Sequence, residues 1–581
     1  MKRILIFLGT SIQTYKWILG ILTIAMLLRG YNIHNYGLGF DQIQILQNAE
    51  KIAQADFTLI GPVTGPANMH TGPLIYYIAG AIYWIFPSPY SVAITALLIA
   101  LITGVTLALL TKRYIPSMIH TILAIWGLSP FVIHLDRIPW NPNLTLLAST
   151  CVFFPFVRSH KKGALKLVDH LVVSLGIFLG YQAHFSGLFL LPLAIALLFL
   201  KQRRSFGYLF LYLGALAISL SPTILFDLRY EMRNYNGVVE LFNNRVGNTD
   251  GSVISQLLSN IKITVENIGK MIFKSSSYAL IITTGLAMFA IHSFQSIKTN
   301  IKQVTYIWIA LIIIGFSLYR YSMPEYYFTI QFPAIFVLIA SLVSTFSSKT
   351  KRIIIILFTL YTTTHIINTY SQPDSFSISN QIELSNEINN IITANPKMQI
   401  VYDMEMDNAI ALEYLIDTTQ TENHSNQPSP LIHIVYPYQS DHKKVKIYQK
   451  YAYWLDYRTQ PTMNYLETDE FILKMEKPIQ LYKDYYLKSL SDPNYTFLLL
   501  NDSLPIGWYA MYINHTTIDE LKRTVFTDKD LTHYSDWEPI NDNTIAKFSH
   551  IDTILFTRKD NSQEWDEIKS MLNKIQYQKI D

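Results

Sequence analysis

Apolar residues gather in long blocks between about residue 12 and residue 369, whereas residues 370–581 mix charged, polar and apolar side chains at ordinary density. A helix needs roughly 17 to 25 apolar residues to cross a hydrocarbon core of about 30 Å. The pattern therefore predicts a membrane domain over 1–369 and a soluble domain over 370–581. Eleven segments, some of them short, are predicted to span the membrane: 12–29, 90–110, 115–133, 143–157, 168–184, 186–200, 206–226, 277–293, 304–320, 325–345 and 352–369.

The composition agrees with a membrane protein, because 50% of the 581 residues are hydrophobic and only 15% are charged. The net charge of +4 is too small and too scattered to indicate a nucleic-acid partner. Cys151 is the single cysteine, which excludes an intrachain disulfide and a thiolate metal site. The first apolar segment resembles a signal peptide, but it continues to Leu28 without an evident cleavage site, so we expect a retained helix.

Clusters of basic residues set the expected orientation of the spans. If each cluster is cytoplasmic, all eleven spans satisfy the positive-inside rule, with the N-terminus inside and the C-terminal domain outside. Segment 30–89 then stays outside, and Leu74–Phe86, rich in Tyr, is expected to lie at the interface; a twelfth span there would invert half of the clusters. These clusters are Lys2 and Arg3; Lys112 and Arg113; Arg158, Lys161, Lys162 and Lys166; Lys201, Arg203 and Arg204; Lys298 and Lys302; and Lys349, Lys351 and Arg352.

The first outer loop contains three Gly-Pro dipeptides around His70: Gly61-Pro62, Gly65-Pro66 and Gly72-Pro73. Pro fixes φ and Gly permits close approach of the backbone, so these dipeptides indicate a folded loop packed over the membrane half. The loop is expected either to shape a substrate chamber or to serve as a structural plug.

Ionisable residues at the outer ends of membrane helices are candidates for chemistry, because a charge near lipid is costly unless it is paired or functional. Asp41 precedes a segment with helical periodicity, QIQILQNAEKIAQADF. Its carboxylate is either a general base that faces a cavity or the cap of that surface helix, and both roles are compatible.

The loop HLDRIPWNPN, between two predicted spans, is a second candidate site. Arg137 would bind a phosphate, while Trp140 and Asn141 would contact a sugar face and its hydroxyls. The structural alternative is a simple pair between Asp136 and Arg137.

Other outer positions are less distinctive. His184 lies at a tight turn, where a hydrogen-bonded structural role competes with one in a site. Arg320 and Tyr321 lie in another outer loop, where a charged side chain commonly snorkels to water. The sequence contains no nucleotide-binding, zinc-hydrolase or serine-hydrolase motif in a credible context. Its polar residues gather at one face without an internal repeat, which favours interfacial chemistry over transport.

The order of these motifs resembles a known family, the GT-C membrane glycosyltransferases, in the branch of protein O-mannosyltransferases and lipid A aminoarabinose transferase (glycosyltransferase family 39). The resemblance covers about residues 12–345. It includes an acidic residue in the first outer loop, Asp41; the HTGPLIYYI segment, His70 to Ile78; the RIPWNPNLTLL segment; and the long outer loop after the seventh span.

The resemblance implies transfer of a sugar, with inversion, from a polyprenyl-phosphate donor to a hydroxyl of a glycan, lipid or protein on the outer face. Asp41 would be the base, and Arg137 or Arg320 would assist the departing phosphate. Trp140, Asn141 and Tyr321 would lie on the donor side, and His70, Tyr76 and His184 on the acceptor side. Many members have Asp-Glu where this chain has Asp41-Gln42, so a divalent metal lacks a clear ligand set.

The C-terminal segment 370–581 is expected to form an extracytoplasmic α/β or α+β domain, because helical signals accompany strand-like runs at 398–403, 431–437, 495–501, 508–514 and 553–559. The architecture suggests a bacterial inner membrane. Two other functions stay open, a flippase or exporter of lipid-linked glycan and a non-catalytic envelope-assembly protein.

Overall fold

The protein, described by a computed structural model, forms two compact units, Met1–Ser379 and Asn380–Asp581. The structure describes residues 2–64, 69–158, 165–201, 207–230, 232–243, 253–273, 278–294, 299–318, 323–372, 376–394, 399–403, 406–416, 431–435, 446–448, 451–456, 495–500, 507–512, 538–539 and 553–559.

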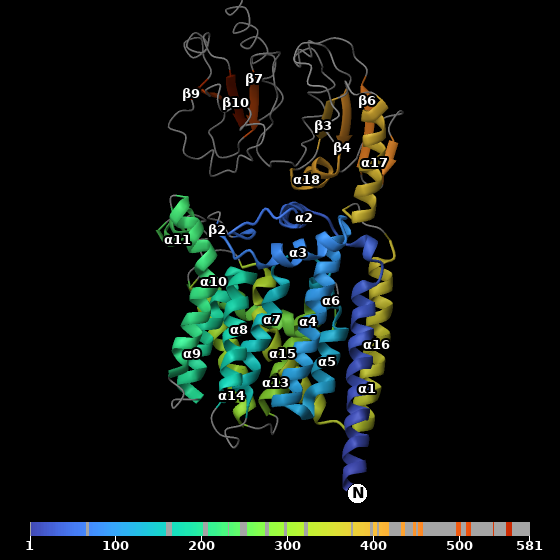
Figure 1. Ribbon diagram of the computed structural model, residues 1–581, viewed down its shortest axis with the longest axis vertical. Coiled ribbons are helices and arrows are strands. Elements are labelled where there is room, and N and C mark those ends of the chain that lie inside the picture. The colour runs from blue at the N-terminus through green and yellow to red at the C-terminus, as the bar shows by residue number, and fades with distance from the viewer. Residues whose placement is uncertain are drawn as a thin grey trace, which may run out of the picture. The chain divides into compact units, whose positions relative to one another are not determined.

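The first unit is helical (Figure 1), and a helix lies at each of the eleven segments predicted to span the membrane. The prediction of a polytopic helical membrane protein is confirmed. In chain order the elements are α1 (Lys2–Gly30), η1 (Ile33–Asn35), α2 (Phe40–Ala53), β1 (Val63–Thr64), β2 (Met69–His70), α3 (Leu74–Ile85), α4 (Tyr90–Tyr114), η2 (Pro116–Met118), α5 (Ile119–Leu128), α6 (Pro130–Asp136), α7 (Asn143–Val157), α8 (Leu167–Ala183), η4 (Phe185–Phe189), α9 (Leu190–Lys201), α10 (Leu209–Arg229), α11 (Arg233–Asn243), α12 (Val253–Lys270), α13 (Tyr278–Phe294), α14 (Thr299–Ser317), η6 (Glu325–Gln331), α15 (Phe332–Ser344) and α16 (Ser348–Tyr370).

Among the described residues, five helical stretches are long and apolar enough to cross a membrane by themselves: α4, α10, α14, η6 with α15, and α16. The stretch from Pro116 to Asp136 is a sixth, although it bends by 61° between α5 and α6. The bend occurs at Ser129, because a residue before proline is driven out of the helical region, and the Ser129 hydroxyl caps the new helix by accepting from the Val132 N–H. The full count of eleven spans stays a prediction.

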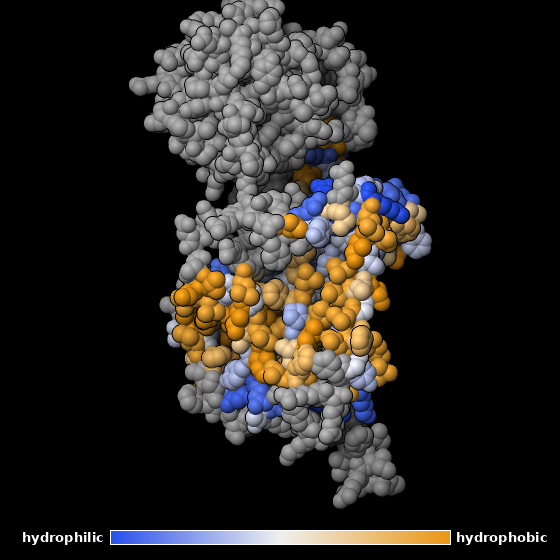
Figure 2. Space-filling view, turned by 90° about the vertical axis from the view of Figure 1, so that its left-hand side faces the viewer, coloured by the Kyte–Doolittle hydropathy of each residue, from blue (hydrophilic) through white to orange (hydrophobic). Residues whose placement is uncertain are grey.

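The outer surface of these helices is apolar where a lipid bilayer would meet it. On α10, Phe210, Ile218 and Leu228 are all exposed. Figure 2 shows a band of hydrophobic surface on the face of the first unit that is turned to the viewer, bordered below by hydrophilic residues. Large apolar side chains that face outward over several helices are expected of a membrane protein, because lipid tails are as apolar as the side chains.

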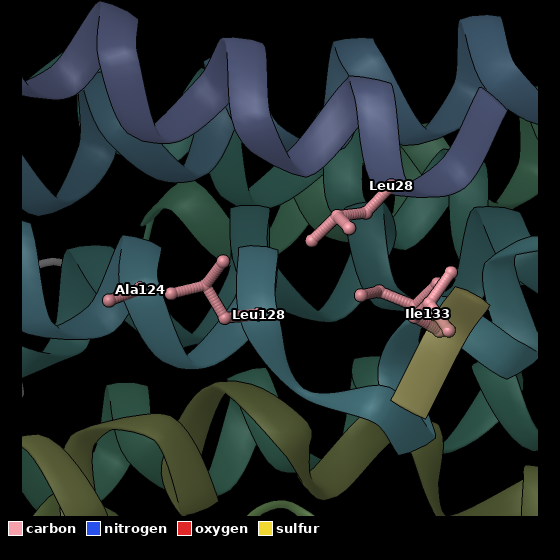
Figure 3. Close-up of a cluster of buried hydrophobic side chains, with 5 residues drawn as sticks. Leu28, Ala124, Leu128 and Ile133 are labelled. Atoms are coloured by element: carbon pink, nitrogen blue, oxygen red, sulfur yellow. The ribbon is translucent and has the colours of Figure 1, made fainter. Parts of the chain in front are cut away.

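The first and last helices of the membrane domain pack on the bent pair α5 and α6. Leu28 of α1, Ala124 and Leu128 of α5, Ile133 of α6 and Ile366 of α16 form one buried cluster (Figure 3). The chain after α16 also returns to the segment between α1 and α2, since Gly37 and Ser377 form an isolated β-bridge. Residues up to Ser379 therefore belong to the first unit.

Two of the basic clusters used to predict topology converge on one buried carboxylate. Asp169, at the start of α8, pairs with Arg113 at 2.7 Å and with Arg158 at 2.9 Å, and it also accepts from the Tyr114 hydroxyl. The carboxylate thus fastens the ends of α4 and α7 to α8, in addition to any role of these arginines in orienting the chain.

The described part of the second unit contains α17 (Ile378–Ala394) from Asn380 onward, α18 (Met406–Leu415) and two four-stranded sheets, ordered β3-β4-β6-β5 and β7-β10-β8-β9. In each sheet one parallel pair is followed by antiparallel pairs, so the described part is a mixed α/β arrangement. The five strand-like runs predicted from the sequence coincide with β3, β4, β7, β8 and β10. The strands are β3 (Gln399–Asp403), β4 (Leu431–Val435), β5 (Lys446–Tyr448), β6 (Tyr451–Asp456), β7 (Tyr495–Leu500), β8 (Gly507–Tyr512), β9 (Glu538–Pro539) and β10 (Thr553–Lys559).

Candidate functional site

The Gly-Pro loop is a small hairpin whose base is closed by glycine. The Gly61 N–H donates to the Thr71 carbonyl at 2.8 Å, and the Thr71 N–H donates to the Pro62 carbonyl at 3.1 Å. A Cβ at Gly61 would lie 2.1 Å from the Gly72 carbonyl oxygen, so only glycine permits this approach. Gly65 and Pro66 lie outside the described residues.

His70 is held at the end of this hairpin in one tautomer. Its Nδ1 lies 3.0 Å from the Gly61 carbonyl oxygen, which can only accept, so Nδ1 carries the proton. Its Nε2 has no hydrogen-bond partner among the described residues. Burial lowers the pKa of His70 below its ordinary value, although the bond to Gly61 opposes the shift, and the ring is neutral at pH 7.

A chain of hydrogen bonds connects His70 to the segment that follows α10. The His70 N–H donates to Asn234 Oδ1 at 2.7 Å, and the Asn234 side chain donates to Asp227 at 3.1 Å. Asp227 also accepts from the main-chain N–H groups of Asn234 and Tyr235, at the start of α11. The Gly-Pro loop and the start of α11 are therefore positioned together.

The start of α3 is docked on α8 by one amide. Gln182 Oε1 accepts from the Leu74 N–H at 3.1 Å, and its Nε2 donates to the Ser219 carbonyl at 2.8 Å. A Cβ at Gly72 would overlap this Gln182 side chain. Tyr76, in the first turn of α3, is buried.

Asp41 lies in the first turn of α2, but it is not the cap. Gly39 is the N-cap residue, and its N–H donates to Gln42 Oε1 at 2.9 Å. The capping role weighed for Asp41 from the sequence is therefore performed by Gly39 and Gln42. Burial raises the pKa of Tyr76, and the negative charge of Asp41 raises it further.

Gln42 connects the start of α2 to the loop that contains the Trp-Asn-Pro-Asn motif, Trp140 to Asn143. Its Nε2 donates to the Pro139 carbonyl at 3.2 Å, while its Oε1 holds Gly39. A glutamate could accept from Gly39 but could not donate to Pro139. This double contact gives Gln42 a structural role that a glutamate at the same position could not fill.

We predict that Gln42→Glu lowers the free energy of unfolding by about 1 to 3 kcal/mol, because a carboxylate would face an unpaired buried carbonyl. The measurement is denaturant unfolding in detergent micelles, followed by tryptophan fluorescence. Gln44→Glu, at a half-buried position on the same helix, is the control. Equal losses in both variants would contradict the bridging role of Gln42.

A cavity lies beside the Trp-Asn-Pro-Asn loop, residues Trp140 to Asn143. It is lined mainly by apolar groups, with an aromatic pair at one side, since the Trp140 and Tyr326 rings lie 4.6 Å apart. Trp140 Nε1 donates to Asn143 Oδ1 at 2.8 Å, which fixes the indole. The lining residues are Val132, Leu135, Asp136, Trp140, Pro142, Asn143, Leu146, Tyr326, Thr329 and Phe332.

The structure places Arg137 in a cage of main-chain carbonyls. Its guanidinium donates to the carbonyls of Arg29, Tyr31 and Asn32, and lies over the rings of Tyr36 and Tyr370, with 4% of the residue exposed. Burial lowers the pKa of Arg137 below its usual range. The guanidinium thus joins the segment after α6 to the segment after α1.

Asp136 does not pair with its neighbour Arg137, contrary to the structural alternative drawn from the sequence. It pairs with Arg29 of α1 at 2.7 Å. The sequence did not indicate this partner. Arg29 ends the first apolar segment, where a basic residue is common and gives no sign of a buried ion pair.

The turn between α8 and η4, at Ala183 and His184, contacts both Asn141 and η6. Asn141 Nδ2 donates to the Ala183 carbonyl at 2.5 Å. His184 Nδ1 accepts from the Ser186 N–H at 3.1 Å, and its ring lies 4.4 Å from that of Tyr327. The contacts bring the Trp-Asn-Pro-Asn loop, this turn and η6 together.

A cluster of charges on α12 was not predicted as part of the site. Lys270 pairs with Glu325 of η6 and lies 4.0 Å from Glu266, and its ammonium is over the Phe131 ring. The spacing of Glu266 and Lys270, four residues apart in an amphipathic segment, was the available signal. Lys270 thus contacts Glu325 and Phe131, which directly precede the lining residues Tyr326 and Val132 in the chain.

Arg320 and Tyr321 lie outside the described residues. Within the part of the chain that the structure describes, no group of three or more His, Cys, Asp or Glu side chains could hold a metal ion.

The fold was compared with known proteins. No protein-family model matches the chain, and no curated protein matches it. Among solved structures, ArnT from Cupriavidus metallidurans bound to undecaprenyl phosphate matches with 11% identity and a TM-score of 0.48, over 76% of this chain and 98% of ArnT. The archaeal oligosaccharyltransferase AglB from Archaeoglobus fulgidus, in complex with an inhibitory peptide and a dolichol-phosphate, matches with 14% identity and a TM-score of 0.38, over 74% and 62%.

ArnT and AglB are GT-C membrane glycosyltransferases, the class that the sequence resembles. Because both TM-scores lie below 0.5, the likeness by itself assigns no substrate and no catalytic residue to this chain.

Proposed function

We propose that the protein is a membrane glycosyltransferase that moves a sugar from a polyprenyl-phosphate donor to an acceptor hydroxyl, with Asp41 as the general base. One observation carries the proposal. Gln42, the residue after Asp41, donates to the Pro139 carbonyl, and the next residue, Trp140, lines the cavity, which supports a position of Asp41 near the cavity.

The chemistry is a single displacement. Asp41 accepts the proton of the acceptor hydroxyl, and the oxygen attacks the anomeric carbon of the sugar. The bond from that carbon to the phosphate oxygen breaks, and the lipid phosphate leaves with the electron pair. Attack on the face opposite the leaving group inverts the anomeric configuration.

The side chains that line the cavity have the chemistry that a lipid-linked sugar requires. The faces of Trp140 and Tyr326 provide an aromatic surface on which a sugar ring can stack, and Asn143 holds the indole in place. The apolar side chains of Leu135 and Phe332 suit the first isoprene units of the lipid.

The departing phosphate needs a cation close to the cavity. Arg29 and Arg137 are committed to Asp136 and to main-chain carbonyls. Lys270 is partly exposed and pairs with Glu325, the residue before the lining residue Tyr326, so we assign it to the phosphate, which would take the place of Glu325. Arg320 keeps its expected role as a second cation.

We place the reaction on the non-cytoplasmic side, in the inner membrane if the source is bacterial. The support is the distribution of the basic clusters, which orients the loops of Asp41 and Trp140 to that side.

We predict that Lys270→Met weakens binding of undecaprenyl phosphate about tenfold, because the ammonium supplies a charge-assisted bond to the phosphate. Binding is measured with purified protein in detergent. Lys262→Met, an exposed position on the same helix, serves as the matched control and should bind normally. Unchanged binding in the Lys270 variant would remove this residue from the proposal.

The function itself is tested by incubating the purified protein with radiolabelled undecaprenyl-phosphate sugars and a detergent extract of its source membranes. The expected result is a labelled product in which the sugar is covalently bound to a component of the extract. If liposomes show movement of the lipid-linked sugar across the bilayer without any covalent product, the protein is an exporter instead.

A further inference from the structure

We propose that Asn267 and Gln331 form a subsite that binds hydroxyl groups of the donor sugar. The inference rests on the glycosyltransferase function proposed above and names two residues that recognise its substrate. Neither residue has a feature in the sequence that separates it from other amides of the chain.

The subsite belongs to a buried polar stripe on α12. Asn260, Thr264 and Asn267 are spaced by four and three residues, so they share one face of the helix. Asn260 Nδ2 donates to Ser317 Oγ of α14 at 3.1 Å, and Thr264 Oγ1 lies 3.1 Å from Gln331 Oε1 of η6. The contacts place Asn267 near η6, one turn beyond Thr264.

Two side chains of the stripe have hydrogen-bonding capacity that the described part of the chain does not use. Asn267 and Gln331 are both 0% exposed. Among the described residues, Asn267 Nδ2, Asn267 Oδ1 and Gln331 Nε2 have no hydrogen-bond partner. A buried amide without partners is costly, especially in a membrane protein, and such a group is expected where a ligand completes it.

The position of Lys270 indicates which ligand this is. Lys270 follows Asn267 by three residues, so their Cβ atoms lie about 5 to 6 Å apart on one face of α12. A sugar attached to a phosphate at Lys270 would therefore reach Asn267. The phosphate would replace Glu325 at Lys270 and so release η6, a 3-10 helix that also carries Gln331.

The unused atoms favour a sugar over a second phosphate or an apolar group. Asn267 offers both a donor and an acceptor, whereas an ionised phosphate presents acceptors only and would leave Oδ1 unpaired. Two neighbouring hydroxyls of a sugar supply one donor and one acceptor, which matches the amide. Gln331 Nε2 adds a further donor for a ring or hydroxyl oxygen.

The test compares binding of undecaprenyl phosphate with binding of its mannosyl, glucosyl and arabinosyl esters, using the full chain in detergent. We expect the wild type to bind at least one ester about tenfold or more tightly than the bare lipid, since each hydrogen bond contributes several-fold. Asn267→Leu should lose this preference and keep its affinity for undecaprenyl phosphate. Its melting temperature should not fall, because the variant removes an unpaired amide.

Asn260→Leu is the matched control, because it changes the same residue type on the same helix at a position whose amide is already paired. It should lower the melting temperature and keep the preference for the ester. If Asn267→Leu fails to fold, Gln331→Met provides the same comparison.

The outcomes separate the subsite from the function. Loss of the preference in Asn267→Leu alone supports the subsite. Retention of the preference in Asn267→Leu, or equal binding of bare lipid and all three esters by the wild type, overturns it while leaving the lipid site intact. A wild type that binds neither bare lipid nor ester overturns the proposed function.

Discussion

Asp41→Asn is expected to lower the rate of sugar transfer about 10²- to 10⁴-fold, the usual contribution of a positioned general base. Asparagine keeps the shape of the side chain but has no lone pair basic enough to take a proton from a hydroxyl. Since Gly39 and Gln42 provide the cap of α2, the substitution should leave the helix intact. Turnover is measured with radiolabelled undecaprenyl-phosphate sugar, and donor binding is measured separately.

Glu50→Gln removes one negative charge from the same helix, near its other end, and provides the control. It should transfer the sugar at the wild-type rate. Equal turnover of the Asp41 variant and the wild type would show that another group takes the proton, and the assignment of the base would be lost.

The second large effect is expected from Arg29→Met, which should lower the free energy of unfolding by about 3 to 5 kcal/mol. The Arg29 guanidinium is fully buried, and all of its N–H groups have partners. Nε and one terminal nitrogen contact Asp136, and the remaining bonds reach the carbonyls of Ala25, Trp126 and Gly127. Its removal leaves the carboxylate of Asp136 buried without a compensating charge.

Unfolding of the variants is followed in mixed micelles by tryptophan fluorescence. The double variant Arg29→Met with Asp136→Leu should recover part of the loss, because it no longer buries a lone charge. Arg113→Met should cost less than about 1 kcal/mol, since that side chain is 46% exposed and Asp169 keeps Arg158. A loss in Arg29→Met no larger than in Arg113→Met would refute the role of the buried pair.

The contacts of Arg29 also show what Asp136 and Arg137, the adjacent charged residues before the Trp-Asn-Pro-Asn loop, do in the structure. Asp136 binds the side chain of Arg29, and Arg137 binds the main-chain carbonyls that follow it. Two adjacent residues therefore clamp the Trp-Asn-Pro-Asn loop to the beginning of the first outer loop, which also carries Asp41. In our proposal these residues position the site rather than bind the substrate.

The sequence by itself determined where the membrane helices and five of the strands lie, because hydrophobic periodicity is a local property of the chain. It also pointed to Asp41, His70 and Trp140, since Gly, Pro and charged residues stand out against apolar blocks. The tertiary structure decided the partners. Arg29 and Asp136 are 107 residues apart, and Gln42 and Pro139 are 97 apart. Which groups meet over such separations depends on how the helices pack, and the pattern of a single segment does not contain that information.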